Sequence, residues 1–151
     1  MAHHRETLVE GLRDILRAAG TTIGSRFYRG RQLPVEDTEL PAGLVYQGDE
    51  QSPPDDVRSL KRRGLETFIE LHHKSDPATL NDPDIETKLN ELAREVEVAL
   101  EADFTLGGRC LFFIHVGTLT RIEDGDSNRG TIRLQLNVQY RTLRTDPSIQ
   151  G

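Results

Sequence analysis

Residues 131–143 read TIRLQLNVQYRTL, and this stretch decides the fold of the chain. Apolar side chains stand at every second position from Ile132 to Tyr140, and Arg, Gln or Asn stands between them. A period of two is that of a β-strand with one face in a core and the other outside it. The stretch therefore predicts a half-buried strand, with a polar face of Arg133, Gln135, Asn137, Gln139 and Arg141.

The segment before this strand predicts its partner in a long antiparallel hairpin. Residues 110–121 open with the apolar run Cys110–Ile114, which favours a central strand covered on both faces. Residues 122–129 are polar, and Asp124-Gly125 within them is a strong turn signal. Cys110 is the only cysteine of the chain, and we expect it as a small buried side chain rather than a nucleophile.

Two segments have the 3.6-residue period of amphipathic helices. The first covers residues 5–19 and ends at Gly20, a residue type that stops helices. The second has Asp82 as its predicted N-cap and Pro83 at its first helical position, and its apolar stripe runs over residues 85–100.

Three further stretches, residues 21–29, 44–46 and 60–73, are predicted strands. Two helices suffice to cover one face of a small sheet. We therefore expect one α+β domain over residues 1–151, with a four- or five-stranded, mostly antiparallel (mixed) sheet and two helices packed on one face. The other sheet face must then meet water or another subunit.

The remaining segments predict little regular structure. Residues 48–57 read GDEQSPPDDV, with four acidic residues, two adjacent prolines and no apolar side chain before Val57. We expect a mobile acidic loop here, and the sequence leaves open whether it becomes ordered on binding a partner. Residues 145–151 are expected as a loose C-terminal tail.

The overall charge argues against nucleic-acid binding as the main role. The net charge is −6 and the isoelectric point is near 5.4, whereas nucleic-acid binders need a basic footprint. Two basic stripes, Arg26–Arg31 and Arg58–Arg63, are interpreted as solvated surface, with phosphate binding as the alternative. No segment has the length of a membrane span and the first residues lack a signal-peptide pattern, so we expect a soluble protein made in the cytoplasm.

The residues that could support catalysis do not form a known motif. His72 and His73 point to opposite faces of a predicted strand, and His115 lies on another strand without ligand spacing around it. The chain has no Gly-rich phosphate loop and no Gly-x-Ser-x-Gly elbow. We therefore expect no catalytic, cofactor or metal site. If the protein were instead an enzyme, the alternative hypothesis is a small metal-dependent hydrolase that uses His72, His73 or His115.

Several segments over residues 5–144 together carry a family resemblance through their order and spacing. After the first helix these are Thr21-Thr22-Ile23, Leu33-Pro34, Glu39-Leu40-Pro41-Ala42, Leu44-Val45-Tyr46, Leu92–Leu100, Thr105-Leu106-Gly107-Gly108 and Val138-Gln139-Tyr140-Arg141-Thr142. In this arrangement the chain resembles the tail-terminator and minor tail proteins of long-tailed phages, the lambda U protein-like group.

The resemblance implies a non-enzymatic structural protein of the virion, made in the cytoplasm of a bacterial host. Such proteins form a hexameric ring that caps the tail tube, stops its polymerisation and provides the surface that joins the tail to the head. The implied partners are further copies of the chain, the tail tube protein and the head–tail connector or stopper protein, and DNA passes through the ring without specific binding. Another head–tail joining component, a stopper or adaptor, is the alternative.

Composition suggests which residues would make such contacts. The acidic loop would meet a basic neighbour. The tip of the predicted hairpin, residues 121–129, and the arginines Arg29 and Arg31 would contact the ring or the tube. The predicted contact residues are Arg29, Arg31, Asp49, Glu50, Asp55, Asp56, Arg121, Asp124, Asp126 and Arg129.

Overall fold

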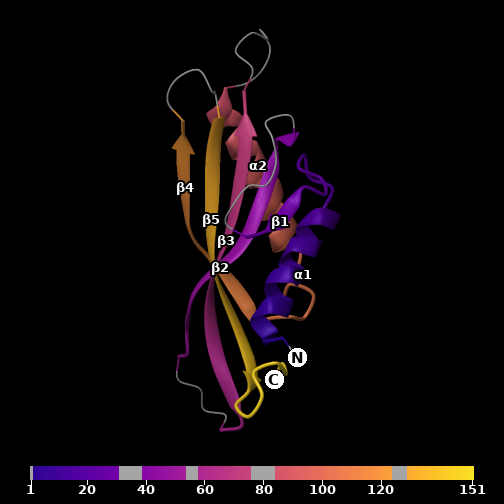
Figure 1. The fold of residues 1–151 in the computed structure, drawn as a ribbon, viewed down its shortest axis with the longest axis vertical. Helices are drawn as coiled ribbons and strands as arrows, with labels where there is room; N and C mark the ends of the chain where they lie inside the picture. The colour runs from indigo at the N-terminus through magenta and orange to yellow at the C-terminus, as the bar shows by residue number, and fades with distance from the viewer. Residues whose placement is uncertain (1, 31–38, 54–57, 76–83, 124–128) are drawn as a thin grey trace.

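The computed structural model contains a five-stranded sheet with two helices on one face (Figure 1). It describes residues 2–30, 39–53, 58–75, 84–123 and 129–151. In chain order the elements are α1 (His4–Ala18), β1 (Phe27–Arg29), β2 (Ala42–Gln51), β3 (Leu60–Lys74), α2 (Ile85–Glu101), β4 (Phe112–Ile122) and β5 (Arg129–Leu143). The strand order is β1-β2-β3-β5-β4, with only the β1–β2 pair parallel. The predicted α+β class with a mostly antiparallel, mixed sheet is confirmed.

The centre of the sheet is the antiparallel pair β3–β5, which is in register from Leu60 opposite Leu143 to Lys74 opposite Arg129. The alternation predicted for β5 is confirmed, because its apolar residues from Ile132 to Tyr140 are at most 2% exposed. They pack in one core with the apolar side chains of β3 and of both helices. Burial of each large apolar side chain contributes about 1.5–3 kcal/mol, which makes this face the main source of stability.

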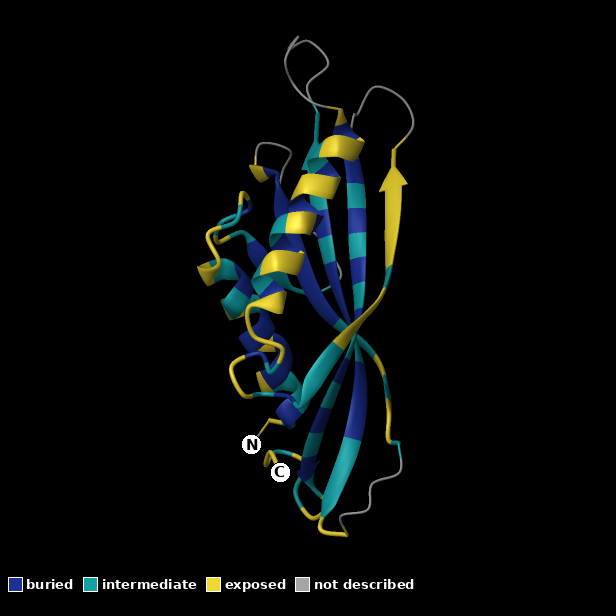
Figure 2. Cartoon of the chain, turned by 180° about the vertical axis from the view of Figure 1, so that it is seen from behind, coloured by how far each residue is buried: buried dark blue, intermediate teal, exposed yellow. Residues whose placement is uncertain are grey.

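The two helices pack mainly on β1, β2, β3 and β5, and β4 lies at the edge of the sheet beyond them. Helix α1 packs on β1 and β2, whereas α2 packs on β3 and β5 (Figure 2). The N-cap of α2 is Asp84, whose carboxylate accepts a hydrogen bond from the Thr87 amide at 2.8 Å. The prediction that Asp82 caps this helix was therefore wrong, and Asp82 and Pro83 lie outside the described residues. Asp84 has an extended backbone, which lets its side chain fold back over the first turn.

The first two strands differ in length from their predictions. Strand β1 is restricted to Phe27–Arg29, because the chain turns at Gly24, which has a φ of +66° and donates to the Thr21 carbonyl. Strand β2 is longer than predicted and passes through an irregularity between Gln47 and Glu50 before it pairs again with β3. The prediction of a loop was thus wrong for Gly48–Gln51, while residues 54–57 of that segment lie outside the described residues.

A buried ion pair explains why this acidic stretch continues as a strand. The Glu50 carboxylate, 11% exposed, accepts a hydrogen bond from the Arg63 guanidinium at 3.0 Å and lies 3.6 Å from that of Arg5. It also accepts a hydrogen bond from the Tyr140 hydroxyl, and burial together with this bond raises the pKa of Tyr140 far above its ordinary value. Arg63 in turn donates to the Thr142 hydroxyl at 3.0 Å. Glu50 therefore joins α1, β2, β3 and β5 in one polar network.

The C-terminal segment is bound to the domain, so the prediction of a loose tail over residues 145–151 was wrong. The Pro147 carbonyl accepts from the His4 amide at the start of α1, at 3.0 Å. The Gly151 amide donates to the Arg141 carbonyl, and the Leu143 amide donates to the Ile149 carbonyl. These backbone bonds hold the segment against β5 and against the first turn of α1, which brings the two ends of the chain close together (Figure 1).

Strand β4 is an edge strand, which contradicts the prediction of a central strand covered on both faces. It pairs with β5 through the register from Phe112 opposite Gln139 to Ile122 opposite Gly130, and in the described part of the chain no strand pairs with its other side. Phe113 of β4 packs against the core, and His115 contacts Glu97 of α2. The other apolar side chains, Ile114, Val116, Leu119 and Ile122, stay exposed because α2 packs mainly on β3 and β5.

We predict that Gly43→Ala destabilises the fold. Gly43 lies opposite Phe27 in the β1–β2 ladder, and a Cβ atom there would stand 2.6 Å from Cδ1 of that fully buried ring. Overpacking of this kind costs about 1–3 kcal/mol, measurable as a lower free energy of unfolding in urea. Gly117→Ala is the control, because a Cβ at that position meets nothing within 4 Å. Equal stability of the two variants would contradict the packing described here.

Candidate assembly surface

Strand β4 presents apolar side chains to solvent along most of its length. Ile114 and Val116 are 55% and 57% exposed, and Leu119 and Ile122 are 40% and 45% exposed. We call these four residues the β4 surface. Seven large apolar side chains are exposed among the described residues, and more than half of them are on this one strand (Figure 2).

Such an arrangement is unusual for a monomeric domain. The outer side of an edge strand carries backbone amide and carbonyl groups that can pair with another chain, and proteins that avoid association block such edges with Lys, Pro, a bulge or a short strand. Strand β4 spans 11 residues and contains neither Lys nor Pro, and its register with β5 shifts once, between His115 and Gly117. Ile114 and Leu119 stand opposite Asn137 and Arg133 on the sheet face away from the helices, whereas Ile122 stands opposite Gly130 on the helix side. Exposed apolar side chains beside an open edge favour an interaction site.

Strand β4 has a bulge at Val116 and a contact with α2 through His115. The register with β5 shifts between His115 and Gly117, which leaves Val116 as the extra residue. His115 lies on the helix side of the strand, where its Nδ1 is 3.1 Å from the Glu97 carboxylate and its Nε2 is 2.9 Å from the Thr118 hydroxyl. This contact holds the strand at the side of the helix, while Val116 stays exposed.

The open sheet face, away from the helices, carries a polar cluster around a small aromatic group. Tyr46 packs on Phe68, and the Arg133 guanidinium lies 4.7 Å from the Phe68 ring centre. The Glu70 carboxylate accepts from the Tyr46 hydroxyl at 2.8 Å and lies 2.9 Å from His72 Nε2. The hydrogen bond with His72 holds the pKa of Glu70 below its ordinary value, and burial raises the pKa of Tyr46.

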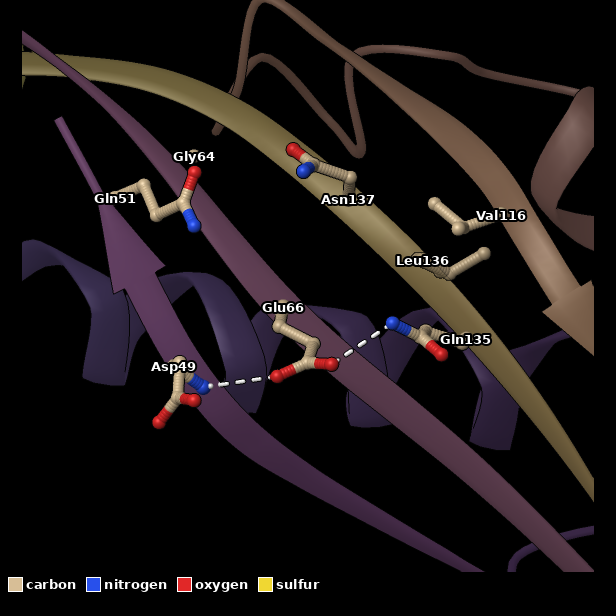
Figure 3. Close-up of a pocket in the computed structure, with 8 residues that line it drawn as sticks. All are labelled: Asp49, Gln51, Gly64, Glu66, Val116, Gln135, Leu136 and Asn137. Carbon is tan, nitrogen blue, oxygen red and sulfur yellow. Dashed lines mark hydrogen bonds between the residues drawn. The ribbon is translucent and has the colours of Figure 1, made fainter. Parts of the chain in front are cut away.

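A hollow of about 280 Å³ on the same face is lined mainly by polar groups (Figure 3). The Glu66 carboxylate lies within it and accepts from the Gln135 amide at 2.8 Å and from the Asp49 backbone amide at 3.1 Å (Figure 3). Both oxygens of Glu66 are therefore used inside the subunit. The hollow offers hydrogen-bonding groups to a partner surface rather than a carboxylate poised for proton transfer.

The histidines considered for metal binding are separated from one another. His72 contacts Glu70 on the open face, whereas His73 accepts from the Lys74 amide at 2.8 Å and His115 lies on β4 beside Glu97. Within the described ranges, no three His, Cys, Asp or Glu side chains are arranged to hold a metal ion. The buried thiol of Cys110 was expected, and burial raises its pKa to about 12, which suppresses the thiolate.

The predicted contact residues fall into three groups in the structure. Arg121 and Asp49 are exposed, on β4 and β2. Arg29 binds Glu6 at 3.3 Å on α1, and Glu50 belongs to the internal network, so both have partners within the subunit. Arg129 opens β5 opposite Lys74. The remaining predicted residues lie outside the described part of the chain; they are Arg31, Asp55, Asp56, Asp124 and Asp126.

Sequence reasoning missed the β4 surface itself. The run of apolar residues after Cys110 predicted burial, and apolar character alone does not distinguish a covered strand from an uncovered one. One signal was present in the second half of the strand, where Thr118, Thr120 and Arg121 interrupt the apolar run. Such interruptions are more typical of a strand with one side in solvent.

Comparisons with known proteins find similarity among solved structures only. No family model and no curated protein matches the chain. Among solved structures, the chain is similar to one described as "Virion of native gene transfer agent (GTA) particle", at 12% sequence identity and a TM-score of 0.42. The match covers 85% of this chain and 90% of that one. As for membranes, the helices in the described ranges are too short or too polar to span a bilayer.

We predict that His72→Ala raises the pKa of Glu70 and that His73→Ala leaves it unchanged. The hydrogen bond with His72 is the largest cause of the lowered pKa, and a carboxyl whose pKa is lowered in the folded state contributes stability above its ordinary value of 4.5. That contribution is lost as the pH falls through the folded-state pKa. The side-chain carboxyl shift of Glu70, followed by NMR against pH, measures the effect, and an unchanged midpoint in His72→Ala would refute the assigned cause.

Proposed function

We propose that this chain is a non-enzymatic structural subunit that assembles with further copies of itself into a ring at the head-proximal end of a phage tail. In this role the ring caps the tail tube, stops its growth and offers the surface on which the head is joined. DNA passes through the ring, and an acidic subunit with a net charge of −6 does not retain it electrostatically.

The observation that carries this proposal is the exposure of the β4 surface. Ile114 and Val116 are more than half exposed on an edge strand that is free to meet another chain. Subunits that act by docking need such a surface, and apolar groups contribute to binding only when a partner removes them from water.

The sequence resemblance supplies the specific role. It extends over residues 5–144 and implies a fold of helices and strands, and this chain has an α+β architecture. The polar contacts of His72, His115 and Glu66 lie within the subunit and are scattered over both faces of the sheet. This arrangement favours a role in assembly over one in chemistry.

The proposal predicts rings in the purified protein or on the ends of tail tubes, visible by negative-stain electron microscopy. Particles that lack the protein are expected to carry tails of uncontrolled length. The double variant Val116→Glu with Leu119→Glu places two charges on the β4 surface and is expected to abolish ring formation while the fold is retained.

Ala18→Glu is the matched control, because it adds a charge at an exposed site on α1, away from β4. It is expected to leave the rings intact. Tails of normal length in particles without the protein would exclude the terminator role. Binding to the connector without binding to tube ends would instead identify a stopper or adaptor.

A further inference from the structure

A second hollow on the open sheet face combines apolar walls with positive charge. Its volume is about 360 Å³, and it lies where β4 pairs with the C-terminal half of β5. We call it the β4 hollow; its side chains include Phe112, Ile114 and Val116 on β4, Asn137 and Gln139 on β5, and Arg62 on β3.

Arg62 gives this hollow its charge. Its guanidinium lies 5.8 Å from the Phe112 ring centre, and its Nε donates to the Gln139 side chain at 3.2 Å. Arg62 stands opposite Arg141 in the β3–β5 register. An anionic group from a partner that meets the Arg62 guanidinium makes a complementary charge contact.

The end of α2 carries a surface with the opposite character. Val98 and Phe104 are both 60% exposed, and the exposed carboxylates of Glu101 and Asp103 lie between them in the chain. We call these four residues the α2 knob. The carboxylate of Asp103 accepts hydrogen bonds from the amides of Thr105 and Gly107, which fixes the turn that presents Phe104.

The knob and the hollow complement each other in charge and in apolar character. The knob has two carboxylates and two exposed apolar side chains, and the hollow has one arginine and four apolar residues, Pro53, Phe112, Ile114 and Val116. Two copies of a chain with a net charge of −6 repel one another over much of their surface, so contact is favoured where a basic site meets an acidic one.

The two surfaces lie on opposite sides of the sheet. The knob follows α2 on the helix side, where the loop after α2 is tied to α1 by the bond between His4 and the Arg109 carbonyl at 2.9 Å. The hollow is on the open face, with Asn137 and Gln139 of the polar side of β5. A contact between them is head to tail, and repetition of such a contact generates a closed ring or an open filament.

We propose that the α2 knob of one copy docks into the β4 hollow of the next, with Phe104 against Phe112 and Ile114 and with the knob carboxylates facing Arg62. This inference rests on the proposed function, since it names the contact through which the ring subunits associate. The partner is a second copy of this chain.

Two variants that are each defective at one surface test the contact. Phe104→Glu damages the knob and Ile114→Glu damages the hollow, and both side chains are more than half exposed, so the fold is expected to persist. Each variant alone is expected to be monomeric. An equimolar mixture is expected to form a two-copy species, because an intact knob and an intact hollow remain, and light scattering coupled to size-exclusion chromatography measures the mass.

Cysteine pairing gives an independent readout. A mixture of Phe104→Cys and Ile114→Cys is expected to form a disulfide between copies under mild oxidation, whereas Phe104→Cys mixed with Ala18→Cys is not. The native Cys110 has its Sγ 3.5 Å from the Phe104 carbonyl, so the cysteine variants are made in a Cys110→Ala background, which removes the competing thiol. Circular dichroism of every variant confirms that the fold is retained.

The outcomes separate this inference from the proposed function. If the wild type forms rings and both Phe104→Glu and Ile114→Glu still form them, the proposed contact is wrong, while the proposed function as a ring subunit stands. Sensitivity to Ile114→Glu alone means that the hollow binds something other than the knob, which also overturns the inference. Wild-type protein that stays monomeric at every concentration and on tube ends overturns both.

Discussion

The pairing of β3 with β5 is the constraint on which the rest of the structure depends. The two strands come from distant parts of the chain and remain in register over their whole length, from Leu60 with Leu143 to Lys74 with Arg129. Closing so long a loop costs chain entropy, which the burial of the helix-facing side chains offsets. Once this pair is formed, β2 and β4 add to its two outer sides, and α2 packs across it.

The width of this sheet decides where the molecule is uncovered. Helix α2 packs mainly on the central pair and α1 on β1 and β2, so in the described part of the chain β4 is covered only in part, at Phe113 and His115. The apolar side chains of Ile114 and Val116 therefore remain exposed. The same geometry leaves the open face to polar groups, such as the Glu66–Gln135 pair, and to the Arg62 site. The candidate assembly surface thus follows from the fold, because two helices cover most of the five-stranded sheet but leave apolar side chains of β4 exposed.

Polar contacts join the first turn of α1 to β2, β3 and β5. Glu50, Arg63 and Tyr140 meet there, and the C-terminal segment is bound through Pro147 to the amide of His4. A buried ion pair of this kind is stabilising only while every partner is present, because removal of one leaves an unpaired charge. This requirement makes Glu50 part of an internal network rather than a contact residue.

Local sequence determined the elements whose pattern has a fixed period. The alternation over residues 131–143 and the apolar stripes of both helices follow from side-chain order alone, so the helix–strand order and the α+β class could be predicted. The apolar character of Ile114 and Val116 was also visible, and so was the acidic character of Asp49 and Glu50. Only the tertiary structure decided that the first pair is exposed on an edge strand and that Glu50, 11% exposed, is paired with Arg63. Exposure and ion pairing depend on which distant strand lies alongside, and no local pattern contains that information.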